Sequence, residues 1–184
     1  GAFPFPGGTA NDTVVLDASL NSAGTPATKK FTGQIVVNGN GGDDKLDASK
    51  VKVATFGVVF DGGNGNDTAL GGASHDTLGG GDGNDSLSGG AGNDLLTGGR
   101  GDDQLLGGAG NDTLTGEGGD DVYLFASGSG DDSIVEESGA SNGYGFDKID
   151  TSANATNTTV QKLNDGTYTL TVGSDSIAFS NVEK

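Results

Sequence analysis

A nine-residue repeat between Gly62 and Leu124 constrains this chain more than any other feature of its sequence. Seven consecutive units follow one another without a gap: GGNGNDTAL, GGASHDTLG, GGDGNDSLS, GGAGNDLLT, GGRGDDQLL, GGAGNDTLT and GEGGDDVYL. The sixth residue is always aspartate, and the eighth is alanine, leucine or tyrosine. Related single copies begin at Gly7, Gly39 and Ser127. A repeat of this kind indicates a solenoid whose units stack and bury a shared core.

The pattern within each unit predicts a short strand followed by a tight turn. The last three residues alternate, as in Thr113-Leu114-Thr115, which favours a three-residue strand with its middle side chain facing inward. The other six residues contain two or three glycines in most units and therefore suit a turn. Because such a turn reverses the chain, we expect two repeats to form one coil and the coils to stack at about 4.8 Å. The predicted fold is all-β, a parallel β-roll.

Stacking would collect the aspartates into two columns that need cations. Alternate repeats place one set on one side, Asp67, Asp85, Asp103 and Asp121, and the other set opposite, Asp76, Asp94 and Asp112, continued by Asp132. Carboxylates at this spacing repel one another. Residues 62–124 hold eleven acidic side chains and one basic side chain, Arg100. Carboxylate and backbone carbonyl oxygens suit Ca²⁺ better than Mg²⁺, so we expect about five to eight calcium ions.

The repeat resembles the RTX (repeats-in-toxin) haemolysin-type calcium-binding family, whose units read GGxGxDxUx. The close resemblance covers about a third of the chain. It implies that each ion lies between turns two repeats apart and takes the aspartate of both, with Asp44 and Asp12 as further candidates. It also implies carbonyl ligands from the glycine-rich turns, for which the candidates are Gly63, Gly65, Gly72, Gly81, Gly83, Gly90, Gly92, Gly99, Gly101, Gly108, Gly110 and Gly119.

Two repeats depart from the family pattern. The second has Ser74 where glycine is usual, so the turn that carries Asp76 is expected to be distorted. The seventh has Glu117 at its second position and shifts its glycine pair to Gly118-Gly119.

We expect three segments along the chain. Residues 1–61 are predicted to form irregular solenoid coils and an N-terminal cap, with strands near 35–37, 45–47 and 58–60. Residues 62–135 form the calcium-binding roll. Residues 136–184 are predicted to form an antiparallel β C-terminal cap, with strands near 146–151, 159–163, 168–172 and 176–180.

Composition argues against several functions. The 184 residues carry a net charge of -17 and include no cysteine, which disfavours nucleic acid as a partner and removes disulfides and thiol chemistry. No apolar stretch is long enough to span a membrane. The single histidine, His75, lies at a variable turn position and is expected to be exposed, which argues against a zinc hydrolase. Without a GxSxG motif, we expect no catalytic residue and no enzyme activity.

We therefore predict a calcium-binding module that folds on binding Ca²⁺ outside the cell. The family resemblance implies a secreted bacterial protein, free or associated with the cell surface, whose parent is exported unfolded by type I secretion machinery. The module would then support secretion, folding and stability of that larger protein. Two alternatives stay open: an extracellular binding module (an adhesin, surface-layer or polysaccharide-binding segment), or the non-catalytic tail of a secreted protease, lipase or alginate epimerase.

Overall fold

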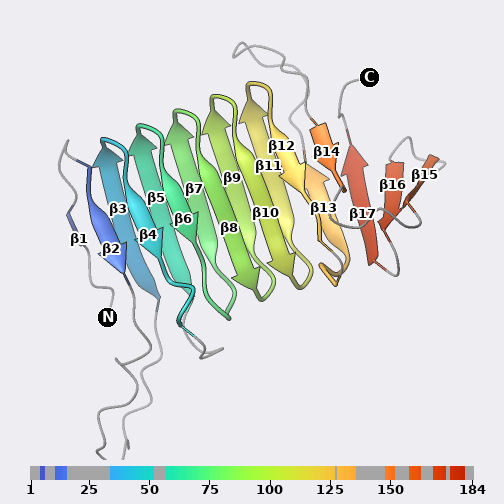
Figure 1. Ribbon diagram of the computed structural model, residues 1–184, viewed down its shortest axis with the longest axis horizontal. Helices are drawn as coiled ribbons and strands as arrows, with labels where there is room; N and C mark the ends of the chain where they lie inside the picture. The colour runs from blue at the N-terminus through green and yellow to red at the C-terminus, as the bar shows by residue number, and fades with distance from the viewer. Residues whose placement is uncertain are drawn as a thin grey trace, which may run out of the picture.

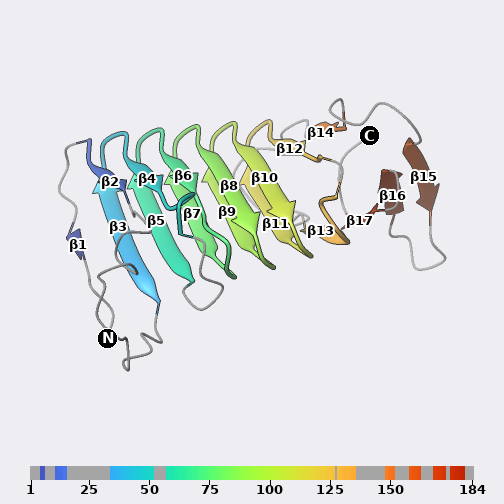
Figure 2. The same ribbon diagram turned by 60° about the horizontal axis from the view of Figure 1, so that its bottom comes forward.

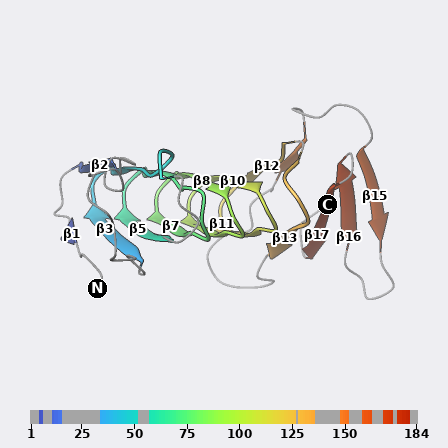
Figure 3. The same ribbon diagram turned by 90° about the horizontal axis from the view of Figure 1, so that it is seen from below.

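The structure is a computed structural model that describes residues 5–6, 11–15, 34–51, 57–126, 128–135, 148–151, 158–162, 168–172 and 175–180. Every regular element in these residues is a strand, and the strands form two sheets. The strands lie side by side along the long axis of the molecule (Figure 1), and a view from below shows the two sheets as separate layers (Figure 3). Among the described residues there is no helix that could cross a membrane.

Consecutive strands of the roll alternate between the two sheets. In spatial order, the ten-stranded sheet contains β1 (Phe5–Pro6), β3 (Ile35–Gly41), β5 (Val58–Asn64), β7 (Thr77–Asp82), β9 (Leu95–Arg100), β11 (Thr113–Gly118), β13 (Asp132–Val135), β17 (Asp175–Ser180), β16 (Tyr168–Val172) and β15 (Thr158–Lys162). The seven-stranded sheet contains β14 (Lys148–Asp150), β12 (Val122–Leu124), β10 (Gln104–Ala109), β8 (Ser86–Ala91), β6 (Thr68–Leu70), β4 (Lys45–Asp47) and β2 (Thr13–Val15). Strands of successive coils pair in parallel, for example β7 with β9 and β8 with β10. The prediction of an all-β parallel roll is confirmed.

The strands of the central repeats are longer than predicted. Elements β7, β8, β9, β10 and β11 each span six residues, because the glycines that open the next repeat also pair with the neighbouring coil. Gly81, for instance, lies opposite both Gly63 and Gly99. The connecting turn is correspondingly short, as in residues 83–85. The expectation of three-residue strands is correct for β4, β6 and β12 and wrong for the longer elements.

A narrow apolar core lies between the two sheets. The eighth residue of every repeat is at most 1% exposed, which confirms its predicted inward orientation: Ala69, Leu78, Leu87, Leu96, Leu105, Leu114 and Tyr123. Phe60 and Ile134 continue one column of this core, and Leu46 continues the other. Because each strand of these repeats contributes one apolar side chain to the core, and β6 contributes only Ala69, little apolar surface is buried for each residue that is ordered.

The flanking segments continue the same stack. Strands β3, β4 and β5 occur where strands were predicted and pair in register with the coils that follow, with Leu46 opposite Ala69. Near the C-terminal end, β15, β16 and β17 are antiparallel, as expected of a cap, while β17 also pairs in parallel with β13. The antiparallel strands thereby extend the ten-stranded sheet (Figure 2). Strand β14 was expected in the antiparallel cap, but it pairs in parallel with β12 and continues the seven-stranded sheet of the roll, so that expectation is wrong for this strand. The division of the chain into three segments stays a prediction.

Candidate metal centre

Each turn directs its aspartate into the stack and towards the turn two repeats earlier. The Oδ1 atom of Asp103 accepts a hydrogen bond from the backbone N–H of Asp85 at 2.7 Å. The backbone carbonyl of Asp85 in turn accepts from the N–H of Gln104 at 2.9 Å. The backbone of the aspartate is therefore satisfied within the stack, and its side chain is held in one orientation.

The same hydrogen bond recurs along two columns of aspartates. One column runs through Asp12, Asp44, Asp67, Asp85, Asp103 and Asp121, and the other through Asp76, Asp94, Asp112 and Asp132, with N–O distances of 2.6–2.9 Å. All of these side chains except Asp12 are buried, with 1–4% exposure. Asp12 is exposed and contributes its backbone N–H to the end of the first column. The structure thus brings together the aspartates that the repeat spacing singled out.

The second carboxylate oxygen is the atom available to a cation. Several of these buried Oδ2 atoms have no hydrogen-bond partner in the described part of the chain, among them those of Asp44, Asp67, Asp85, Asp94, Asp103 and Asp112. The glycine that opens each repeat lies directly against this oxygen, where a side chain would not fit. A Cβ atom on Gly62 would collide with the Oδ2 atom of Asp67 and would lie 2.6 Å from the carbonyl oxygen of Gly80. A carboxylate oxygen and a carbonyl oxygen from successive coils therefore lie close together, and this combination of hard oxygen ligands suits Ca²⁺.

Carboxylates by themselves do not make a metal site here. No group of three or more His, Cys, Asp or Glu side chains that could hold an ion occurs among the described residues. A cation between the turns must therefore take further ligands from the backbone. The predicted carbonyl donors stack along the roll, since a Cβ atom on Gly81 would collide with the carbonyl oxygen of Gly63. Gly81 has φ of 113°, a conformation that glycine adopts without the strain of a side chain.

Burial of the carboxylates makes the columns electrostatically costly without a cation. Desolvation raises the pKa of Asp85 to about 6 and the pKa values of Asp94 and Asp103 to about 7. Hydrogen bonds from the preceding aspartate N–H oppose this rise, and the neighbouring carboxylates add to it. Burial raises the pKa values of Asp67 and Asp112 as well. Burial therefore disfavours the ionised form of these carboxylates, and a cation bound beside them would offset that cost.

Comparison with known sequences agrees with this geometry. The family model of the RTX calcium-binding nonapeptide repeat matches residues 61–96, 88–123 and 97–134. The chain carries RTX calcium-binding repeats. Residues 61–134 are called the RTX region below. No curated protein matches the sequence significantly.

One solved structure with a similar arrangement is the extracellular lipase LipA from Serratia marcescens. It aligns with 100% of this chain at 16% sequence identity and a TM-score of 0.36, and the chain spans 38% of the lipase's length. A TM-score of this size does not bear on function or substrate.

The second repeat of the RTX region differs from the others, in line with the sequence. The Oδ1 atom of Asp76 accepts from the N–H of Val58, and its Oδ2 atom accepts from the N–H of Gly72, both at 2.7 Å. Backbone groups therefore occupy both oxygens of this carboxylate, and Asp76 offers less to a cation than Asp94 does. In the seventh repeat Glu117 has φ of 74°, in a left-handed conformation that is uncommon for residues other than glycine.

A second hydrogen-bonded ladder follows the rim of the turns and was not predicted. The N–H of Asn84 donates to the Oδ1 atom of Asn66 at 2.8 Å, and the N–H of Asp102 donates to the Oδ1 atom of Asn84 at 3.0 Å. On the other side His75 takes the same place, and its Nδ1 atom accepts from the N–H of Asn93 at 2.7 Å. His75 is exposed, as expected. The signal was present in the sequence, because the fifth position is Asn or Asp in six of the seven repeats.

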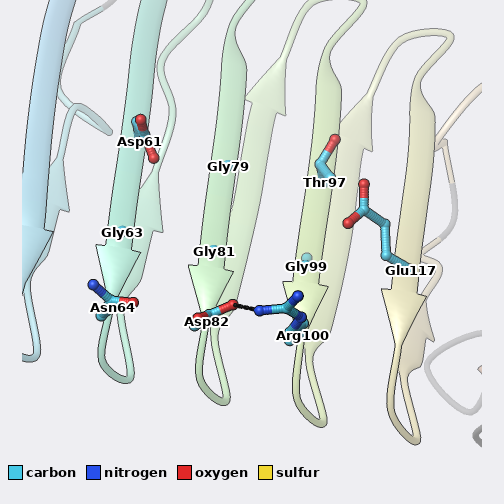
Figure 4. Close-up of a pocket in the computed structure, with 11 residues that line it drawn as sticks. Asp61, Gly63, Asn64, Gly79, Gly81, Asp82, Thr97, Gly99, Arg100 and Glu117 are labelled. Carbon is cyan, nitrogen blue, oxygen red and sulfur yellow. Dashed lines mark hydrogen bonds and ion pairs between the residues drawn. The ribbon is translucent and has the colours of Figure 1, made fainter. Parts of the chain in front are cut away.

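A shallow groove lies on the outer face of the ten-stranded sheet (Figure 4). Its volume is 490 Å³, and its lining includes Gly81 and Gly99 between the side chains of Asp61 and Glu117. Arg100 forms an exposed ion pair with Asp82 at 3.2 Å along one edge. The groove is open, its charged side chains lie at its margins, and its floor includes glycines that recur in every coil, so it follows from the repeat itself.

Proposed function

We propose that the RTX region binds Ca²⁺ between successive turns. The observation that carries this proposal is a row of buried carboxylate oxygens that have no hydrogen-bond partner within the described residues. Glycine carbonyl oxygens lie beside them. Burying such oxygens costs free energy unless a charge or a donor compensates them. The proposed pairs are Asp67/Asp85, Asp85/Asp103, Asp103/Asp121, Asp76/Asp94, Asp94/Asp112 and Asp112/Asp132, completed by glycine carbonyls. Asp44, which stacks on Asp67, is a further ligand candidate.

Binding of the ions would also fold the roll. Each strand of the repeats contributes a single apolar side chain to the core, and the repeats carry eleven acidic groups against one basic group. Without cations, mutual repulsion and desolvation oppose folding, so the free energy of metal binding becomes free energy of folding. The RTX region is then unfolded at low calcium and folded at the millimolar calcium found outside cells.

The module itself is non-catalytic and belongs to a larger secreted protein. The match to RTX repeats supports this role, since the repeat is a calcium-binding element. Export of the unfolded parent by type I machinery, followed by calcium-driven folding outside the cell, gives the module its part in secretion and stability.

Circular dichroism and native mass spectrometry of the whole chain test the proposal. We expect a β spectrum to develop on addition of Ca²⁺ to the calcium-free chain, to be lost in EGTA, and to require much higher Mg²⁺. Mass spectra at saturating Ca²⁺ should show about five to eight bound ions. A β spectrum that is unchanged by EGTA would refute calcium-driven folding. Fewer than about three ions would contradict a site between each pair of turns.

A further inference from the structure

The side chain at the fifth position of each repeat links neighbouring coils along the rim of the turns. All seven repeats carry Asn, Asp or His there, and these three side chains share a hydrogen-bond acceptor at the δ1 position. Each hydrogen bond runs from a backbone N–H to the δ1 atom of the preceding coil. The donors are Asp43, Asn66, Asn84, Asn93, Asp102, Asn111, Asp120 and Asp131, with donor–acceptor distances of 2.7–3.2 Å. This set of hydrogen bonds is called the rim ladder below.

Each bond of the rim ladder fixes the orientation of one peptide unit, the one between the fourth and fifth positions of a repeat. A trans peptide is planar, and its C=O and N–H groups point in opposite directions. The N–H of Asn84 donates to Asn66 in the preceding coil, so the Gly83 carbonyl of the same peptide must point towards the following coil. The structure has this arrangement, because a Cβ atom on Gly101 would collide with the Gly83 carbonyl oxygen.

The same relation recurs in both columns of turns. The carbonyl oxygens that face the fourth-position glycine of the next coil include those of Gly42, Gly65, Gly92, Gly101 and Gly110. In each case the next residue in the sequence is the donor of a rim-ladder bond. His75 belongs to this pattern, because its Nδ1 atom accepts from Asn93, whose peptide carries the Gly92 carbonyl. A rim acceptor and a forward-facing carbonyl therefore occur together from coil to coil.

We infer that the fifth-position side chain is a positioning residue for calcium, whose δ1 acceptor holds a peptide of the next coil so that its glycine carbonyl is presented to the ion. The inference rests on the proposed calcium binding of the RTX region, in which Gly83, Gly101 and Gly110 are among the carbonyl ligands. The rim side chain acts through the peptide that it orients and does not itself bind the ion. Asn84 and its equivalents are exposed, so this role is separate from packing of the apolar core.

Asn84→Ala in the whole chain removes one rim acceptor and should release the peptide between Gly101 and Asp102. An NMR experiment that correlates the Asp102 amide with the Gly101 carbonyl carbon reports on both ends of this peptide. At saturating Ca²⁺ the Gly101 carbonyl carbon should lose the shift that Ca²⁺ causes in the unmodified chain, and the Asp102 amide should exchange faster with solvent. The Gly83 carbonyl carbon should keep its shift, because Asn66 still holds that peptide. A general loss of stability would not single out Gly101.

Calcium titrations of matched variants provide a second readout. Asn84→Ala should weaken one site about five-fold, the equivalent of one neutral hydrogen bond, at an unchanged ion count in native mass spectra because water can replace a carbonyl ligand. Asn84→Asp should keep both the affinity and the Gly101 shift, because Asp102 accepts in the same way from the N–H of Asp120 at 2.9 Å. Ser86→Ala removes an exposed polar side chain of β8 outside the rim ladder and should change neither.

Asn93→Ala repeats the test in the second column, with the Asn111 amide and the Gly110 carbonyl carbon as the readout. A carbonyl carbon that keeps its calcium-dependent shift in the alanine variants would overturn the positioning role and leave the proposed function intact. An equal change in Ser86→Ala would do the same. Failure of both alanine variants to form the roll in Ca²⁺ would overturn a role limited to the ligands, because the rim ladder would then be needed for the fold as a whole. An unmodified chain that binds no ions would overturn both proposals.

Discussion

Replacing Asp103 by asparagine should destabilise the folded roll when Ca²⁺ is present and stabilise it when Ca²⁺ is removed. The carboxylate is 1% exposed, its Oδ1 atom accepts from the N–H of Asp85, and its Oδ2 atom has no hydrogen-bond partner in the described structure. Asparagine keeps the Oδ1 acceptor and loses the charge. With Ca²⁺ the variant should be less stable, because two proposed sites share this side chain. Without Ca²⁺ the folded state of the variant should be more stable than that of the unmodified chain, because one buried charge among like charges has been removed.

The expected magnitude follows from the position of Asp103 between two turns. Its carboxylate belongs to the proposed pairs with Asp85 and with Asp121. A site filled at 100 times its dissociation constant stabilises the folded state by about 2.7 kcal/mol. Loss of both sites therefore lowers the free energy of unfolding by about 5 kcal/mol at that calcium concentration.

Urea unfolding followed by circular dichroism in saturating Ca²⁺ measures the first effect, and the amount of β structure that each chain retains as Ca²⁺ is withdrawn with EGTA measures the second. Asp102→Asn is the matched control, because this exposed neighbour changes the net charge equally and uses its Oδ1 atom only as an acceptor on the rim of the turns. Asparagine occupies the same position in four other repeats, including Asn84. Less β structure in Asp103→Asn than in the unmodified chain as Ca²⁺ is withdrawn would refute the reasoning, and so would an equal effect of Asp102→Asn on urea unfolding in Ca²⁺.

Three further predictions concern the core, acid and the second repeat. Leu105→Ala should lower the free energy of unfolding by about 2–5 kcal/mol in Ca²⁺, whereas Leu95→Ala, at a side chain 44% exposed, should cost far less; urea titration compares them. In the calcium-free folded state the pKa values of Asp94 and Asp103 are about 7, against 3.8 ordinarily, so the folded state binds more protons than the unfolded state. Without calcium the chain should therefore gain β structure as the pH falls from about 7 towards about 4. A loss of β structure in circular dichroism over this range would contradict the prediction. Asp76→Asn should weaken calcium binding less than Asp94→Asn in calorimetric titrations, because backbone N–H groups already occupy both Asp76 oxygens.

The sequence by itself determined the period of the fold and the membership of the two aspartate columns. A nine-residue unit with one inward apolar residue places alternate repeats on opposite sides of a coil, so Asp85 and Asp103 had to stack. The same logic predicted the inward positions of Leu87 and Leu105, which are at most 1% exposed. These features repeat at fixed spacing, and a periodic pattern can be extended without knowledge of any long-range contact.

Contacts between coils determined the strand lengths and the side-chain hydrogen bonds, which the nine-residue period alone does not specify. Stacking in register let the glycines of neighbouring coils pair, which lengthened strands such as β9. It also aimed the carboxylate of Asp103 at the N–H of Asp85 in the previous coil. In each of these contacts the two partners lie in different coils, so no single nine-residue unit contains both. The contacts therefore follow only from the way in which whole coils stack.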